Sequence, residues 1–278
     1  MEGSVHEGSA IDESAPLLEA VGVSVRYRVR GRHRGAARYL TALDGVNLTW
    51  REGETLALVG ESGSGKSTLG RVLLGLLPPT SGQVKYGGLP ITKAVERKLR
   101  RDVQLIFQDP YQSLSPRSTV GTQVSAGLEI HEIGERGVER TAIGLAALSA
   151  AGLNPPEVYW RRYPHQLSGG ERQRVVIAGA MALGPRALVC DEPVSALDVS
   201  VRAQVLNVLA TLRSQRGLSL LFITHDVRLA RQMSDRIVVL YRGNVVEEGS
   251  TATVLADPQH DYTKRLLAAV PSVRVGSR

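Results

Sequence analysis

The chain of 278 residues contains one cysteine, Cys190, and few aromatic residues. A single cysteine excludes an internal disulfide and any metal or iron–sulfur site built from cysteines alone, and it fits a reducing compartment. Aromatic residues make up 4% of the chain, and 27 acidic residues are interspersed among the basic ones. Both features argue against a nucleic-acid partner, in spite of a formal net charge of +7.

Long apolar runs are also missing. None reaches the roughly 18 residues of a membrane-spanning helix, so any membrane association must come through another subunit or a surface contact. Residues 1–16 are polar and acidic without an apolar stretch of signal-peptide length, and we expect a disordered lead-in there. The densest basic run, residues 26–38, is interrupted by glycines, and we expect a solvated loop.

Five nearly continuous apolar runs predict strands buried on both faces, as in a parallel sheet covered by helices. Residues 18–27 show a different pattern, an alternation of apolar with small or polar side chains that is typical of a half-buried strand. A weaker strand is expected over 44–50. The five buried runs are 55–59, 103–107, 187–190, 218–223 and 236–241.

The first buried run leads into GESGSGKS at 60–67, which matches G-x-x-x-x-G-K-S and opens a helical stretch. This is the context that a phosphate-binding loop requires. We expect loop N–H groups and the helix dipole to surround the α- and β-phosphates, Lys66 to reach the β- and γ-phosphates, and Ser67 to ligate Mg²⁺. The expected ATP-binding residues of the loop are Gly60, Glu61, Ser62, Gly63, Ser64, Gly65, Lys66, Ser67 and Thr68.

A pair of carboxylates follows another buried run. ALVCDEP places Asp191 and Glu192 at a strand end, where a parallel sheet holds its nucleotide. An Asp-Glu pair is usually a solvated strand end. In a chain with a P-loop, we expect Asp191 to hold Mg²⁺, usually through water, and Glu192 to polarise the attacking water. Cys190 is expected to be a small buried residue without chemistry.

A second glycine-rich helix start lies at LSGGERQR, residues 167–174. Ser168 and Glu171 form a capping-box pattern, which by itself indicates only a well-capped helix. The Ser-Gly-Gly start also offers free N–H donors for anionic oxygens. The residues alone leave both interpretations open.

Helices are predicted between the strands. Apolar residues recur at helical spacing from Val201 to Leu212, and Gly217 supplies a stop before the next strand. Residues from about 110 to 175 carry five prolines between helix-compatible segments and no convincing strand, which indicates an inserted helical subdomain. No internal repeat is evident, so a single nucleotide-binding unit is expected.

The order of the motifs resembles the ATP-binding subunit of ABC transporters. FQDP, LSGGERQR, ALVCDEP, SALD and THD follow the P-loop in that order, and the resemblance covers about residues 17–272. It implies an α/β P-loop NTPase core, mostly a parallel sheet with flanking helices, plus an N-terminal antiparallel β subdomain and the inserted helical subdomain. The implied domains are a disordered segment over 1–16, an ABC ATPase domain over 17–249 and a C-terminal extension over 250–278.

The resemblance implies roles for further residues. Gln108 resembles the glutamine that senses the γ-phosphate and Mg²⁺, and His225 resembles the switch histidine that helps Glu192 to position water. Tyr27 resembles the aromatic residue that stacks on adenine, although a strand-end tyrosine is as often a packing residue. The implied catalytic residues are Glu192, His225, Lys66 and Gln108, and the implied Mg²⁺ ligands are Ser67, Gln108 and Asp191.

Two motifs imply a partner subunit. LSGGE at 167–171, here called the signature motif, resembles the helix start that completes the partner's ATP site across a head-to-tail dimer. The SALD loop resembles the one that crosses this interface, and Asp198 can equally serve as a helix N-cap. The signature residues are Leu167, Ser168, Gly169, Gly170 and Glu171, and the interface loop is Ser195, Ala196, Leu197 and Asp198.

Three stretches resemble the peptide and nickel importers of this superfamily: FQDPYQSLSPR, the basic stretch before TALDGVNL, and PQHDYTKRLLAAVPS. We therefore expect an ATP-hydrolysing subunit at the cytoplasmic face of the cell membrane, with ATP and Mg²⁺ as cofactors. Its expected partners are a second ATPase subunit, two integral-membrane permeases and, indirectly, an extracytoplasmic solute-binding protein. Some subunits of this group carry a C-terminal cysteine cluster for iron–sulfur. No cysteine follows Cys190, which favours the type without the cluster.

Other classes stay open. One is the ATPase of another ABC system, such as an exporter or a lipoprotein-release system, for which the C-terminal ending is the discriminator. Another is a soluble ABC ATPase that acts on ribosomes or DNA, although the second ATPase unit or long coiled coil typical of those proteins is not seen. A third is a module that holds ATP without hydrolysis, against which Glu192 and His225 argue.

Overall fold

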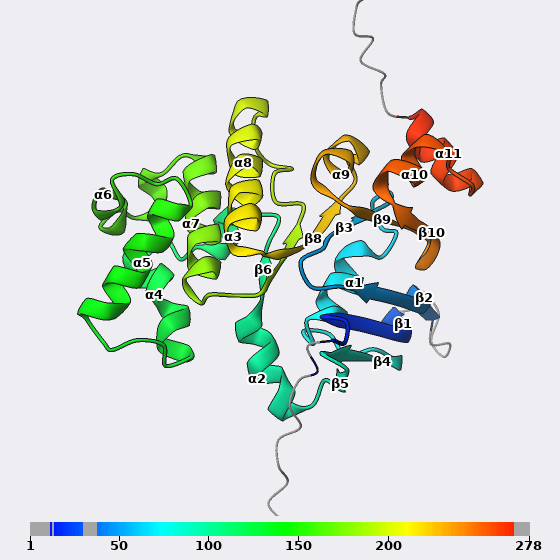
Figure 1. Cartoon of the computed structure of the whole chain (residues 1–278), viewed down its shortest axis with the longest axis horizontal. Coiled ribbons are helices and arrows are strands. Elements are labelled where there is room, and N and C mark those ends of the chain that lie inside the picture. The colour runs from blue at the N-terminus through cyan, green and yellow to red at the C-terminus, as the bar shows by residue number, and fades with distance from the viewer. Residues whose placement is uncertain (1–11, 13, 30–37, 270–278) are drawn as a thin grey trace, which may run out of the picture.

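The computed structural model describes residue 12 and residues 14–29 and 38–269. In this part of the chain, a six-stranded sheet has the order β10-β9-β3-β8-β7-β6, with β10 antiparallel and the others parallel (Figure 1). The five predicted apolar runs form the parallel strands, which confirms a mostly parallel sheet. The strands are β3 (Thr55–Val59), β6 (Val103–Ile106), β7 (Ala187–Asp191), β8 (Ser219–Thr224), β9 (Arg236–Tyr241) and β10 (Asn244–Ser250).

An antiparallel sheet packs beside the first, with helix α1 (Lys66–Leu73) between the two. Leu69 and Leu73 of α1 are fully buried in one apolar cluster with residues of both sheets. Each sheet therefore covers one side of the helix that follows the P-loop. The antiparallel strands, in spatial order, are β2 (Arg38–Trp50), β1 (Leu18–Val29), β4 (Ser81–Tyr86) and β5 (Leu89–Pro90).

The prediction of a loop over residues 26–38 is wrong at both ends. β1 continues to Val29 and β2 begins at Arg38, and the two strands form an antiparallel ladder in which Tyr27 pairs with Leu40. The ladder needs only backbone hydrogen bonds, and Arg26 stays exposed within it, so the basic side chains do not oppose the strand. Residues 30–37 lie outside the described residues.

A helical region separates β6 from β7 and lies at one side of the molecule (Figure 1). All residues from 107 to 186 are described, and they contain no strand. The region has an apolar cluster that includes Leu128, Leu148 and Val175. The domain boundaries expected from the sequence, at residues 16/17 and 249/250, stay predictions. The elements are α3 (Pro110–Ser113), α4 (Val120–Ile130), α5 (Val138–Ala150), α6 (Pro156–Trp160), the 3₁₀ helix η1 (Pro164–Gln166) and α7 (Gly169–Ala182).

Further helices cover the parallel sheet or follow it. The predicted helix after SALD is α8, and it ends at Gly217 in a left-handed conformation, as expected. No helix within the described residues is long and apolar enough to cross a membrane. The remaining helices are α2 (Lys93–Asp102), α8 (Val199–Arg216), α9 (Val227–Met233), α10 (Thr251–Ala256) and α11 (Asp261–Ala268).

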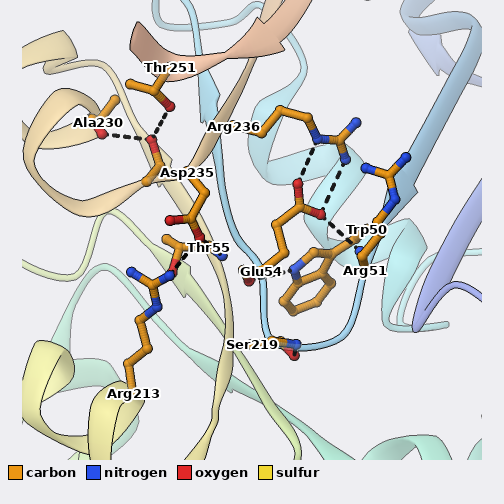
Figure 2. A network of polar contacts seen from close by, with 12 residues as sticks. Trp50, Arg51, Glu54, Thr55, Arg213, Ser219, Ala230, Asp235, Arg236 and Thr251 are labelled. Atoms are coloured by element: carbon orange, nitrogen blue, oxygen red, sulfur yellow. Dashed lines mark hydrogen bonds and ion pairs between the residues drawn. The ribbon is translucent and has the colours of Figure 1, made fainter.

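A polar network joins elements at the amino ends of the parallel strands (Figure 2). The Arg236 guanidinium donates to the Glu54 carboxylate at 2.7 Å and also to the Thr49 carbonyl. Asp235 accepts from Arg213 at 2.6 Å and from the Thr55 N–H at 2.8 Å. The network thus links both sheets to the end of α8, at the edge opposite the P-loop.

Candidate active site

The predicted site residues follow the carboxyl ends of four neighbouring strands. The P-loop follows β3, and the spatial order β3-β8-β7-β6 continues to the strand that precedes Gln108. Parallel pairing places Val59 beside Thr224 and Ile106 beside Cys190. These strands therefore deliver their following residues to one edge of the sheet, as expected for a ligand site in an open α/β sheet.

Two glycines of the P-loop are required by close backbone packing. A Cβ on Gly60 would lie 2.2 Å from the Leu240 carbonyl oxygen, and one on Gly65 would lie 2.5 Å from that of Ala42. Both approaches are closer than any real carbon contact. The loop is thus held against β9 on one side and β2 on the other.

The Lys66 side chain is 5% exposed and lies within the loop. Its ammonium donates hydrogen bonds to the carbonyl oxygens of Gly60 and Glu61, each at 2.8 Å. Burial lowers the pKa of Lys66, and nearby carboxylates, Glu192 foremost, oppose that shift. The loop carbonyls thus fix the position of a cation beside the α1 N-terminus.

Ser67 and Asp191 meet across the sheet edge. The Ser67 hydroxyl donates to the Asp191 carboxylate at 3.0 Å. Burial, together with the charge of Glu192, raises the pKa of Asp191. A hydroxyl and a carboxylate, with the Gln108 amide nearby, are oxygen donors of the kind Mg²⁺ takes when nucleotide phosphates complete its coordination. The donor set therefore fits the expected metal.

Glu192 joins two other predicted residues through its carboxylate. The His225 Nδ1 lies 3.0 Å from one oxygen, and the Gln108 Nε2 donates to the other at 3.3 Å. Glu192 has a φ of 47°, which is uncommon for a residue with a side chain, and its N–H donates to the Ile223 carbonyl at 2.9 Å. Residues after three different strands thus converge on one carboxylate.

An open cavity of about 560 Å³ lies over these groups. Tyr27, 38% exposed, is at its rim beside Leu40. A larger cavity of about 810 Å³ near Arg97 and Arg186 contains none of the predicted residues. The smaller cavity is lined by Tyr27, Leu40, Thr41, Ala42, Ser62, Gly63, Gly65, Lys66, Ser67, Thr68, Gln108, Glu192 and His225.

The signature residues lie at the start of α7 and do not line that cavity. The predicted capping box is present: Ser168 Oγ accepts from the Glu171 N–H at 3.3 Å, and the Glu171 carboxylate accepts from the Ser168 N–H at 2.7 Å. A Cβ on Gly170 would lie 2.2 Å from Val201 Cγ1. Within this chain the motif is therefore a capped helix start that packs closely on α8.

The SALD loop begins next to Glu192. The Ser195 hydroxyl donates to the Glu192 carbonyl at 3.1 Å, and Ala196 and Asp198 are exposed. Asp198 occupies the N-cap position of α8, but its side chain makes no capping hydrogen bond. The loop therefore connects the central carboxylate to the surface. Cys190 is fully buried, and burial raises its pKa to about 12, in keeping with a residue without chemistry.

Two contacts of the P-loop were not predicted. The Glu61 N–H donates to the Tyr262 hydroxyl of α11 at 2.9 Å, and the Gly243 N–H donates to the Ser64 carbonyl at 2.9 Å. Arg242 and Gly243 form a two-residue turn with positive φ between β9 and β10. The apolar runs around Arg-Gly-Asn are a recognisable hairpin signal for this turn. No local signal marks Tyr262 as a neighbour of Glu61.

Comparison with protein families and curated proteins gives consistent matches. The ABC transporter family matches residues 43–195. A putative peptide import ATP-binding protein of Brucella abortus is 49% identical over 250 residues, 88% of this chain and 74% of that protein. The putative oligopeptide transport ATP-binding protein YkfD of Bacillus subtilis is 45% identical over 92% of this chain and 77% of its own. The glutathione import ATP-binding protein GsiA of Salmonella typhimurium is 43% identical over 95% of this chain and 43% of its own.

Two solved structures share the fold. The ATP-binding cassette MJ0796, in a dimeric post-hydrolysis state bound to ADP and Pi, has a TM-score of 0.73 and 32% identity. The match covers 84% of this chain and 98% of that one. CbiO1 of Clostridium perfringens, part of the ABC transporter complex cbiONQ, has a TM-score of 0.73 and 27% identity, with 87% and 92% of the two chains covered.

Proposed function

Since the chain belongs to the family of ATP-binding subunits of ABC transporters, we propose that it hydrolyses ATP to drive peptide import through membrane permeases. The observation that supports hydrolysis is the Glu192 carboxylate, held between His225 and Gln108 above the P-loop. A module that only bound ATP would not require this arrangement.

The catalytic roles follow from the positions of the side chains. Glu192 accepts a proton from the attacking water, and the contacts with His225 and Gln108 orient its two oxygens. Lys66 balances the charge of the γ-phosphoryl group. Gln108 lies between the end of β6 at Ile106 and the start of the helical region at Pro110, so its contact with Glu192 couples that region to the carboxylate.

Ser67, Asp191 and Gln108 would hold Mg²⁺, which would supply positive charge next to the β- and γ-phosphates. The Ser67–Asp191 hydrogen bond brings two of these ligands together at 3.0 Å. Tyr27 stacks on the adenine from the rim of the cavity. Each of these assignments is part of the proposal.

Two subunits close head to tail in this proposal, and the Ser168–Glu171 helix start of each completes the ATP site of the other. The motif does not line the chain's own cavity. The N–H groups of Gly169 and Gly170, in the first turn of α7, have no acceptor within the helix and can serve phosphate oxygens of the partner's ATP. The Ser195–Asp198 loop crosses the interface. The pair of subunits, identical or different, lies peripherally at the cytoplasmic face of the cell membrane and works with two permeases.

Replacing Glu192 with Gln in the assembled transporter tests the hydrolytic role. The variant is expected to bind ATP as before and to lose about a hundredfold or more in turnover, because an amide cannot accept the proton. Glu129→Gln, the same change at an exposed residue of α4, is the matched control and should hydrolyse ATP normally. Unchanged turnover in Glu192→Gln would show that another group is the base.

The solute class is proposed from the relatives, which are named for peptide import, oligopeptide transport and glutathione import. They favour di- or oligopeptides over nickel chelates, and import over export or lipoprotein release. Purification of the tagged chain in mild detergent should retain two permeases and identify the associated solute-binding protein. Calorimetry of that protein with peptide mixtures and with nickel chelates would then separate the two solutes. Recovery without any membrane partner would favour a soluble ABC ATPase.

A further inference from the structure

The C-terminal helix α11 reaches the P-loop through one side chain. Tyr262 is 2% exposed, and its hydroxyl oxygen accepts the Glu61 N–H at 2.9 Å across 201 residues of sequence. The Tyr262 ring stacks on that of Tyr241 with 4.1 Å between ring centroids. It lies in an apolar cluster with Val59, the last residue before the loop. Packing therefore fixes where the hydroxyl meets the loop.

The hydrogen-bonded N–H belongs to the peptide unit between Gly60 and Glu61. The carbonyl oxygen of the same peptide unit is that of Gly60, which accepts from the Lys66 ammonium at 2.8 Å. In a trans peptide the N–H and C=O point in opposite directions. Tyr262 and Lys66 thus hold opposite edges of one planar group, and glycine places little restriction on its rotation.

We infer that Tyr262 is a positioning residue, which orients the Gly60–Glu61 peptide so that its carbonyl holds the Lys66 ammonium for the phosphates of ATP. The β9–β10 turn holds the other end of the same loop, through the Gly243 N–H and the Ser64 carbonyl at 2.9 Å. The part of the chain after β9 therefore contacts both halves of the loop, through residues that do not line the cavity.

Tyr262→Phe is the direct test, because it deletes the acceptor and keeps the ring. The Glu61 N–H, which belongs to a partly buried hydrogen bond, then has no acceptor in the protein, so the Gly60–Glu61 peptide rotates and Lys66 loses its fixed position. We expect the Kd for ATP of the full-length subunit, and the KM of the assembled transporter, to rise about fivefold to tenfold with kcat changed less than about twofold. A fraction of unfolded protein would lower the apparent kcat and leave the KM unchanged, so the split separates positioning from stability.

Tyr241→Phe is the matched control. It removes a hydroxyl from the stacking partner, and that hydroxyl makes no hydrogen bond to the described residues. Its KM and Kd should equal those of the wild type. An unchanged KM and Kd in Tyr262→Phe would overturn the inference.

A second measurement applies even if Tyr262→Phe folds poorly. Amide hydrogen exchange followed by NMR in the wild-type subunit should show the Glu61 N–H protected without nucleotide, and rapid exchange at that amide would overturn the inference. The inference rests on the proposed role of Lys66 in binding ATP. If Lys66→Ala keeps its ATP affinity, that role fails; if Lys66→Ala loses affinity while Tyr262→Phe does not, only the inference about Tyr262 fails.

Discussion

Gly170→Ala separates two possible roles of this glycine, close packing of α7 on α8 and a part in the partner's ATP site. The new Cβ would lie 2.2 Å from Val201 Cγ1, whereas carbon atoms in contact are about 3.5–4.0 Å apart, so α7 and α8 must separate by more than about 1 Å. Overpacking of this kind costs about 1–3 kcal/mol, of which the better helix propensity of alanine recovers at most about 1 kcal/mol. We expect the free energy of unfolding, from urea titration of the subunit, to fall by roughly 1–2 kcal/mol.

The effect of Gly170→Ala on the free energy of unfolding should change sign when Val201 is replaced by alanine. In a Val201→Ala background the clash disappears, and Gly170→Ala should then stabilise the subunit by up to about 1 kcal/mol. A loss of stability in both backgrounds, or in neither, would refute the packing argument. The ATPase activity of the double variant reports on the second role. If the double variant is stable but inactive, the glycine is needed in the partner's ATP site. If it is stable and active, the glycine is needed only for packing.

Two further predictions concern stability. Arg236→Ala removes the ion-pair partner of the Glu54 carboxylate, which keeps only the Arg51 N–H as a donor, at a site where the two side chains are 15% and 11% exposed. It should therefore lower the free energy of unfolding by about 3 kcal/mol. A loss no larger than that of Arg228→Ala, at an exposed arginine, would contradict this. Burial would raise the pKa of Glu171, but hydrogen bonds from Ser168 and Tyr159 outweigh it and lower the pKa below 4.5. The carboxylate therefore stabilises the fold above pH 4.5, and the advantage of wild type over Glu171→Gln in urea unfolding should shrink as pH falls below that value; a constant difference would refute it.

The parallel core and the groups at its carboxyl edge could be predicted from sequence because their signals are local. A strand buried on both faces is a continuous apolar run, and the residue after it is at the sheet edge whatever the rest of the chain does. For that reason Asp191 could be placed near the P-loop from the strand pattern, whereas Gln108 and His225 were placed there by the family resemblance.

Other elements gave weaker signals. β4 has three exposed residues before its buried Val84, so its alternation is too short to recognise. The arginines of residues 26–38 suggested a loop because composition does not report backbone pairing. The hydrogen bond between Glu61 and Tyr262 depends on how α11 packs against the strand before the P-loop. No pattern in the sequence predicts that packing.

The strand order has a consequence for the chain during its synthesis. β3 is the first parallel strand to be made, yet both its neighbours, β8 and β9, come more than 150 residues later. Until they emerge from the ribosome, an apolar segment with two unpaired edges is exposed, and non-local pairing of this kind is slow. A prematurely terminated copy lacking β9 would therefore be prone to aggregation, and its P-loop would lack the backbone of β9 against which Gly60 packs.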